Sequence, residues 1–341
     1  MTTSLRSLPT LLARQREWSL LGLMLVLSLA VWLKAPQFLS PANLSQVAIL
    51  AAIIAVAAVG EALVVLTRNV DLSVDATIGL VAYAVADLLK LHTLDVTAAI
   101  VFGIGLGLLL GIVNGALVTL CRVPSIVATL GTLSVYRGCA YLLAGGSQIS
   151  LSDLPPAYVA LARAGLLGVP LYVLLAAAVT LVAGLWVGRT RFGRQVYAVG
   201  SNPEAAAVLG IRSRLVVFVV FGISGTLAGL AGVLWGAKYG TITAAAADGA
   251  VLQVVAAVVV GGVNIFGGSG SVVGAALGAL FLGLIANGLV LVRLSQFWLQ
   301  AIYGAVILVA VAADAVIVRR MLRAATARRR AAQSAPGAGR A

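Results

Sequence analysis

The chain has 341 residues, of which 62% are hydrophobic and 10% are charged. Soluble domains carry roughly a quarter charged residues, so this sequence has too little polar surface for a water-soluble globule. The net charge of +13 does not indicate nucleic-acid binding, because the basic residues gather in the C-terminal tail and in short segments between apolar stretches. Basic residues in such places determine the orientation of a membrane protein and contact anionic lipid headgroups.

The apolar stretches are continuous, whereas strands of an outer-membrane barrel would alternate. A helix needs ~20 apolar residues to cross a ~30 Å hydrocarbon core, and it satisfies its own backbone there. We therefore predict an all-α polytopic membrane protein with about ten transmembrane helices. Their predicted ranges are 18–34, 45–66, 74–91, 96–120, 125–144, 168–188, 215–237, 250–263, 271–292 and 298–318.

Placing the N-terminus in the cytoplasm and alternating sides leaves most arginines inside, as the positive-inside rule requires. Both termini are then cytoplasmic. This gives a cytoplasmic segment at 1–17, a transmembrane domain at 18–318 with a long cytoplasmic loop at 189–214, and a basic tail at 319–341. The Ala/Arg-rich composition of the tail predicts disorder.

The cysteines, the histidine and the lysines lack the spacing of a catalytic or metal site, so no such site is predicted. Cys121 and Cys139 lack metal-ligand spacing and are expected to be reduced, buried small hydrophobes. The single histidine, His92, falls in a predicted loop. No lysine lies in a phosphate-binding Gly-Lys-Ser/Thr context, so the chain itself is not expected to hydrolyse ATP.

Small residues recur every fourth position, which places them on one helix face and permits close backbone packing. They are Gly103, Gly107, Gly111, Gly225, Gly229, Gly274 and Gly278. The sequence Asn-Gly followed by apolar residues occurs at Asn114 and again at Asn287, in spans predicted to run in opposite directions. This similarity suggests an inverted-topology repeat, although chance is a competing explanation in so apolar a chain.

A polar segment, Thr67–Asp75, lies between the second and third predicted spans. It is either an ordinary inside loop in which Arg68 pairs with Asp71, or a polar surface within the membrane domain. Glu61 lies inside the second span, where a carboxylate is expensive and faces a partner or a path. Arg137 is one candidate partner.

The cytoplasmic loop contains a short predicted helix. Ser201 and Glu204 match a capping box, or Asn202 caps with Pro203 at the first helical position. Gly210 can end the helix. A small apolar helix with no membrane to bury it is either a connector or a segment that docks into a partner.

Two connections differ in character. The stretch Gly261–Gly270 lacks dinucleotide spacing and lysine, and is interpreted as a flexible break between the eighth and ninth spans. The longest outside connection, 145–167, contains two prolines and apolar positions, which makes a short surface helix plausible.

Four motifs together resemble the permeases of ribose-type ABC importers. They are Val70-Asp71-Leu72-Ser73-Val74, the segment from Val123-Pro124 through Thr129-Leu130-Gly131-Thr132 to Arg137-Gly138, the loop Gly193 to Gly210, and the glycines from Gly261 to Gly270. They occur in the family's order across roughly residues 45 to 315. Two departures are Asp75, where glycine is usual, and Arg68-Asn69, which replaces a Gly-Gly pair.

The resemblance implies an inverted-repeat type II ABC importer permease in the bacterial inner membrane. Its partners would be a second permease copy or paralogue, a separate ATPase subunit that holds ATP and Mg²⁺, and a periplasmic or lipid-anchored sugar-binding protein. This chain would bind membrane lipid, no cofactor and no nucleic acid. The residues expected to couple to the ATPase are Gly193, Ser201, Asn202, Glu204, Ala205, Ala206 and Gly210.

Polar residues predicted near the translocation pathway are Asp71, Ser73, Asn114, Thr129, Thr132 and Asn287. The Thr-Arg-Asn-Val-Asp version of the polar segment looks most like permeases for rhamnose or autoinducer-2. Rhamnose is the first expectation for the transported sugar, with autoinducer-2, ribose or a similar monosaccharide next. The alternative is an ion- or proton-coupled secondary transporter, for which Glu61 would carry the coupling chemistry.

Overall fold

A computed structural model describes residues 8–239, 241–295, 297–309 and 311–312, without the side chains of residues 8–16. The regular elements of the described chain are helices, apart from four two-residue strands. The long helices are α1 (Leu8–Lys34), α2 (Pro41–Leu66), α3 (Val74–Lys90), α4 (Val96–Thr119), α5 (Ser125–Ala144), α7 (Leu171–Arg189), α10 (Ser213–Lys238) and α12 (Val272–Leu291). The shorter ones are α11 (Ala250–Val260) and a helix at Trp298–Val309.

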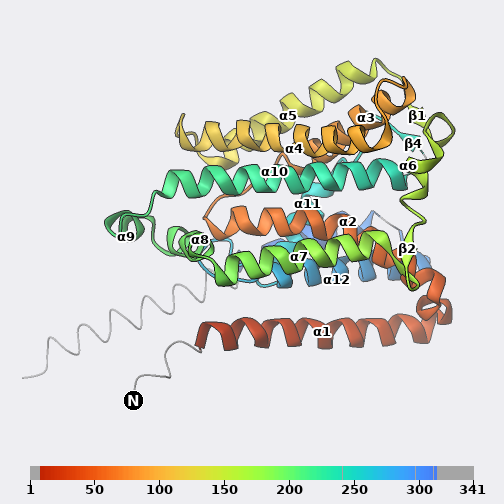
Figure 1. Ribbon diagram of the computed structural model, residues 1–341. Helices are drawn as coiled ribbons and strands as arrows, with labels where there is room; N and C mark the ends of the chain where they lie inside the picture. Colours follow the sequence, from red (N-terminus) through yellow and green to blue (C-terminus); the bar gives the residue numbers. More distant parts are fainter. Residues whose placement is uncertain (1–7, 240, 296, 310, 313–341) are drawn as a thin grey trace, which may run out of the picture.

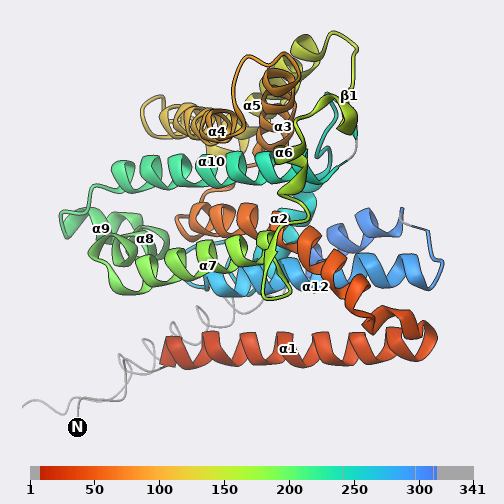
Figure 2. The same ribbon diagram turned by 45° about the vertical axis from the view of Figure 1, so that its right-hand side comes forward.

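Short elements gather at the two ends of this bundle (Figures 1 and 2). One end carries α8 (Arg191–Ser201) and α9 (Pro203–Val208). The other carries η1 (Pro36–Leu39), β1 (Ile149–Ser150), η2 (Leu151–Asp153), α6 (Pro156–Ala160), β2 (Gly165–Leu166), β3 (Val169–Pro170) and β4 (Thr241–Ile242). Strand β1 pairs antiparallel with β4, and β2 pairs with β3 as a hairpin.

Each predicted span corresponds to a helix. Among the described residues, seven helices are long and apolar enough to cross a membrane, whereas α3, α11 and Trp298–Val309 are shorter or more polar. Helix α1 starts at Leu8, earlier than predicted, although its apolar part still begins at Glu17. The surface helix expected in the outer connection is α6. The predicted basic tail at 319–341 lies outside the described residues.

The helices start where the sequence supplies caps. The Ser40 hydroxyl accepts a hydrogen bond from the Asn43 N–H at the start of α2, where Pro41 takes the first helical position. Asp95 caps α4 in the same way, through the Thr97 N–H. Such caps satisfy backbone donors that a helix leaves free in its first turn.

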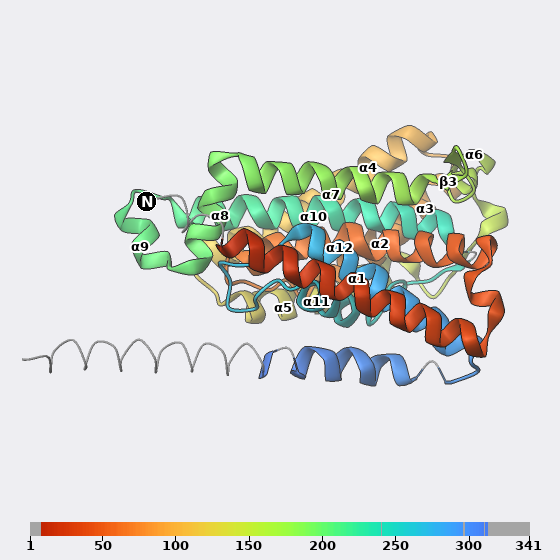
Figure 3. The same ribbon diagram turned by 90° about the horizontal axis from the view of Figure 1, so that it is seen from below.

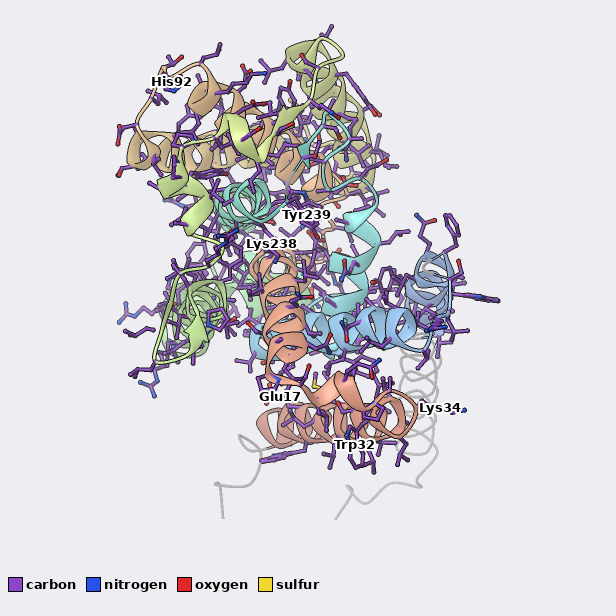
Figure 4. The ribbon with its side chains drawn as sticks, turned by 90° about the vertical axis from the view of Figure 1, so that its right-hand side faces the viewer. Glu17, Trp32, Lys34, His92, Lys238 and Tyr239 are labelled. Atoms are coloured by element: carbon purple, nitrogen blue, oxygen red, sulfur yellow. The ribbon has the colours of Figure 1, made fainter. Side chains whose placement is uncertain are left out.

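The end that carries α8 and α9 also carries the start of α1, as Figure 1 shows. This agrees with the prediction that the N-terminal segment and the loop 189–214 lie on one side of the membrane. That this side is the cytoplasm remains an expectation from the charge distribution. At the opposite end His92 lies in the α3–α4 turn, away from Lys238 and Tyr239 at the end of α10 (Figure 4).

Helix α2 is the centre of the fold. Within its apolar window 94% of residues are buried, against 11% in α1 and 17% in α7. It contacts α7, α10, α11 and α12, while α1 lies on the outside of α12 (Figure 3). The peripheral helices are therefore exposed at the surface of the bundle, and α2 is enclosed by its neighbours.

The packing pattern supports an inverted repeat. Helix α4 packs along α10, and α12 packs along α2. Likewise α3 contacts α4 and α10, whereas α11 contacts α12 and α2. The first half of the chain thus repeats in the second half with α2 and α10, α3 and α11, and α4 and α12 in corresponding places, as proteins with inverted repeats do.

Glycines bring α4 and α10 into backbone contact. A Cβ atom placed on Gly107 would lie 2.5 Å from Cα of Gly229, and one on Gly111 would lie 2.9 Å from Cα of Gly225. The same occurs between α12 and α11, where a Cβ on Gly278 would meet Gly261 N at 3.0 Å. The glycines that recur every fourth position in the sequence therefore lie at the interfaces between helices.

This contact predicts the effect of a larger side chain. Gly107→Leu should destabilise the folded protein by about 1–3 kcal/mol or more, because the α4–α10 backbones must separate. A thermal unfolding scan of the detergent-solubilised protein measures the loss. Gly105→Leu is the matched control, since a Cβ at Gly105 meets open space. Equal melting temperatures for the two variants would contradict the close-packed interface.

Candidate functional site

Helix α8 lies against the ends of the long helices, at the same end of the bundle as α9. The Thr190 hydroxyl caps it by accepting the Gly193 N–H at 3.0 Å. Gly193 is buried against the backbone of Val187, where a Cβ would have no space. Val196 and Val199 are buried as well. Gly193, predicted as a coupling residue, is therefore buried, and its lack of a side chain allows the close backbone packing of α8 against α7.

Helix α9 projects beyond α8 at the end of the molecule (Figure 1). Its cap is Asn202, whose Oδ1 accepts the Ala205 N–H at 3.0 Å, with Pro203 next. Of the two starts that the sequence allowed, the structure has the second. Gly210 ends the helix at φ 77°, and the Ile211 N–H returns to the Ala206 carbonyl at 3.0 Å, a Schellman arrangement.

The outer face of α9 is apolar and exposed. Val208 is 87% exposed and Leu209 is 77% exposed. Glu204 and Ala205 are exposed too, whereas Ala206 is buried. Val208 and Leu209 are not among the predicted coupling residues, and whether any residue of α9 couples to an ATPase remains a prediction. Their apolar character in a segment between membrane spans is the sequence signal that would single them out.

Behind α9, three segments meet backbone to backbone in what we call the glycine junction, formed by Leu66–Arg68, Gly200–Ser201 and Phe266–Gly270. The Gly268 N–H donates to the Leu66 carbonyl at 3.0 Å, and the Ser201 hydroxyl donates to the Gly268 carbonyl at 3.3 Å. The stretch Gly261–Gly270 is thus bonded to its neighbours, which corrects its interpretation as a flexible break.

Arg68 belongs to this junction and not to Asp71. Its Nε donates to the Phe266 carbonyl at 2.9 Å, and its Nη2 donates to the Ser201 carbonyl at 3.2 Å. The pairing of Arg68 with Asp71, considered from sequence, is absent because the Arg68 side chain points to α8 and the α11–α12 loop. Tyr197 adds a hydrogen bond from its hydroxyl to the Gly270 carbonyl, and burial raises the pKa of that hydroxyl.

A buried polar cluster follows directly after Arg68. Asp71 Oδ1 accepts from the Ser73 N–H and the Ser73 hydroxyl at 2.9 and 2.7 Å. Asn114 Nδ2 donates to Ser73 Oγ at 2.8 Å, and the Tyr136 hydroxyl donates to Asn114 Oδ1 at 3.2 Å. The cluster joins the α2–α3 turn to α4 and α5.

Glu61 also belongs to this cluster. It is fully buried, and its Oε1 accepts the Asp71 N–H at 3.0 Å. Its other oxygen has no hydrogen-bond partner among the described residues. The proposed pairing of Glu61 with Arg137 is wrong, because Arg137 is engaged elsewhere.

Arg137 of α5 instead reaches Asp75 and the chain before α11. Its Nη2 lies 3.6 Å from Asp75 Oδ2 and 3.6 Å from Asp248 Oδ1, and its Nη1 donates to the Ala246 carbonyl at 2.9 Å. The side chains of Arg137 and Asp75 are 12% and 3% exposed, whereas that of Asp248 is 73% exposed. Asp75 therefore has a buried cationic partner.

The predicted pathway residues fall into two places. Asp71, Ser73 and Asn114 meet in the buried cluster, and Thr129 joins it by donating to the Val70 carbonyl at 3.3 Å. The Thr132 hydroxyl donates one turn back to the Thr129 carbonyl at 3.3 Å, and its side chain is also hydrogen-bonded to Tyr136 of the cluster. Asn287 lies elsewhere, paired reciprocally with Asn43 at 2.9 Å in both directions. Whether any of them lines a pathway remains a prediction.

The two cysteines differ from expectation. Cys121 and Cys139 are both free and exposed. Cys121 follows the end of α4, and Cys139 lies on the outward side of α5, so an apolar span does not by itself bury its cysteines. Within the described ranges, no group of three histidine, cysteine or carboxylate side chains could hold a metal ion.

A family model and several known proteins match most of the chain. The family model described as "Branched-chain amino acid transport system / permease component" matches residues 43–311. A protein named autoinducer 2 import system permease protein LsrC of Shigella flexneri is 39% identical over 279 residues, 82% of this chain and 80% of that protein. LsrC of Enterobacter sp. (strain 638) is 37% identical over 88% of this chain and 86% of its own length. No solved structure matches significantly.

The buried ion pair predicts a non-additive mutant cycle. Arg137→Gln should lower the free energy of unfolding by about 3–5 kcal/mol, because it leaves the Asp75 carboxylate buried without its cation. Adding Asp75→Asn to that variant should recover part of the loss. Asp248→Asn is the control, expected within about 1 kcal/mol of the parent because Asp248 is exposed. Purely additive unfolding energies for Arg137→Gln and Asp75→Asn would contradict the pair.

Proposed function

This chain belongs to the family of branched-chain amino acid transport system permease components, and we propose that it is the membrane-spanning subunit of an ABC importer for autoinducer-2. It is a multi-pass bacterial inner-membrane protein that transports small sugars or sugar-like solutes. The single observation that carries the finer proposal is the identity of 37–39% to autoinducer-2 import permeases along more than four fifths of the chain.

The substrate expectation changes accordingly. The sequence motif favoured rhamnose, and the comparisons give no support for it, because the relatives that match are named for autoinducer-2 import. Autoinducer-2 was the second expectation from the same motif. The secondary-transporter alternative, with Glu61 as the coupling residue, likewise receives no support from the family.

The partner that supplies energy would dock on α9. Val208 and Leu209 are the most exposed apolar residues at this end of the described chain and lie beyond the membrane-spanning helices. Apolar side chains in such a place are expected to be covered by another protein. A separate ATPase subunit fits the proposal, because no part of this sequence can bind the phosphates of ATP by a P-loop.

The other partners would meet different surfaces. Among the described helices, α5 packs mainly against α3 and α4, and its outward face exposes Ile126, Val127, Leu130 and Val135. A second permease copy or paralogue, or lipid, would cover this face. At the opposite end, α6 and the two small strand pairs offer the surface on which a substrate-binding protein would dock.

A pathway through this chain needs a change in the buried cluster. Asp71, Ser73 and Asn114 bond to one another and are at most 3% exposed, so none of them contacts a solute in the present state. Burying a polar group is tolerated when its hydrogen bonds are made. If these residues line the pathway, their hydrogen bonds must open during transport.

The docking proposal predicts which residues retain the ATPase. Replacing Val208 and Leu209 together with aspartate should abolish co-purification of the ATPase from the native host, because two charges would be buried in the interface. Mass spectrometry of the tagged permease measures the recovery. Leu167→Asp is the control, since Leu167 is 96% exposed at the opposite end. Full recovery of the ATPase with both aspartates would exclude α9 as the docking segment.

Uptake of autoinducer-2 tests the substrate. The chain, with its ATPase and binding protein, should restore uptake to a host that lacks its own autoinducer-2 permease, and a catalytically dead ATPase should abolish it. Competition with excess unlabelled rhamnose should leave uptake unchanged. Uptake of rhamnose without autoinducer-2 would overturn the substrate, and uptake by this chain alone that an uncoupler stops would favour the secondary transporter.

A further inference from the structure

We infer that Arg68 is the positioning residue that links movement of the α8–α9 segment to the buried polar cluster of the membrane domain. The inference rests on the proposed function, since it assumes that an ATPase moves α9. It concerns a residue outside the predicted coupling and pathway sets, and it follows from which segments Arg68 joins.

The first step is the connection from α9 to the junction. Asn202, the cap of α9, follows directly on Ser201, the last residue of α8. The Ser201 carbonyl accepts from Arg68 Nη2, and the Ser201 hydroxyl donates to Gly268. A displacement of α9 therefore acts within one residue on a group bonded to Arg68.

The second step is that the junction has little free space. A Cβ on Gly268 would lie 2.6 Å from Cα of Ser201, and one on Gly267 would lie 2.5 Å from Cγ of Arg68. Gly200 approaches the Leu66 carbonyl so closely that no Cβ would fit. Closely packed segments shift together and not independently, because packed interiors transmit strain.

The third step is the connection from Arg68 into the core. Two residues further on, the Val70 N–H donates to Ser125 Oγ at 3.3 Å, at the start of α5. The next residue is Asp71, whose carboxylate accepts from Ser73 and Asn114 and whose backbone N–H donates to Glu61 Oε1. The segment that Arg68 begins thus reaches α2, α4 and α5 over a few residues.

The backbone at Arg68 shows why a glycine there is a clean test. Arg68 has φ 65°, a left-handed conformation that glycine adopts without steric penalty and that few other residues favour. Arg68→Gly consequently removes the guanidinium and leaves the turn geometry available. Arg68→Lys keeps the charge and loses the planar fork that reaches two carbonyls at once.

The chain contains a matched control. Arg122 is also an exposed arginine in the left-handed region, at φ 58°, in the turn after α4 at the same end of the bundle. Its side chain makes no hydrogen bond to any of the residues that the structure describes. Arg122→Gly therefore reproduces the loss of charge and the backbone change without breaking a junction.

The experiment uses nitroxide labels in the complete permease–ATPase complex reconstituted in lipid nanodiscs. One label sits on the native Cys139 of α5 in a Cys121→Ser background. A second sits on Arg212→Cys, an exposed site just after α9, with both native cysteines replaced by serine. Electron paramagnetic resonance spectra are recorded before and after nucleotide is trapped with vanadate.

We expect both labels to respond in the parent and in Arg122→Gly. In Arg68→Gly the label after α9 should still respond, while the response at Cys139 falls at least about fivefold, the low end of typical coupling between sites. Arg68→Lys should fall between the two.

Three other outcomes have distinct meanings. An undiminished response at Cys139 in Arg68→Gly would overturn the inference. Loss of the response after α9 in that variant would also overturn it, since Arg68 would then act in docking and not in transmission. Failure of the parent to bind an ATPase at all would instead overturn the proposed function.

Discussion

The close approach of helix backbones is the constraint on which this structure depends. Lipid gives two apolar helices no hydrophobic reason to associate, so packing contacts must hold them together. Here glycines remove the side chains that would keep α4 from α10 and α12 from α11, and the backbones touch. Helix α2 is then enclosed, which makes a fully buried carboxylate at Glu61 possible.

Enclosure of α2 also determines which partners the side chains of the polar turn after it can reach. Because Thr67–Asp75 is surrounded by packed helices, its carboxylates are paired inside the protein. Asp71 accepts hydrogen bonds from Ser73 and Asn114, and Asp75 pairs with Arg137. Polar groups in a membrane domain are tolerated when they are paired in this way. The turn therefore belongs to the packed fold and also joins the end that carries α8 and α9 to the core.

The same turn connects the α8–α9 end of the bundle with the buried polar cluster. At one side it meets α8 and the α11–α12 loop, and at the other it meets α4 and α5. An importer must convert a movement at an ATPase into a change at a solute path, and bistable packed elements rather than single bonds carry such changes. Short polar contacts between tightly packed segments suit that task.

The sequence by itself determined the membrane class, the approximate positions of the long apolar helices, the small-residue interfaces and the residues that could begin and end α9. Those features depend on hydropathy, spacing and caps within a few residues of one another, such as Asn202 with Ala205 and Gly210 after Val208. Only the tertiary structure decided the long-range partners. Arg68 joins Phe266 and Ser201, Arg137 joins Asp75, and Asn114 and Asn287 take different partners despite matching motifs. A charge or an amide reaches whichever neighbour helix packing brings close, and periodicity along one segment carries no information about that neighbour.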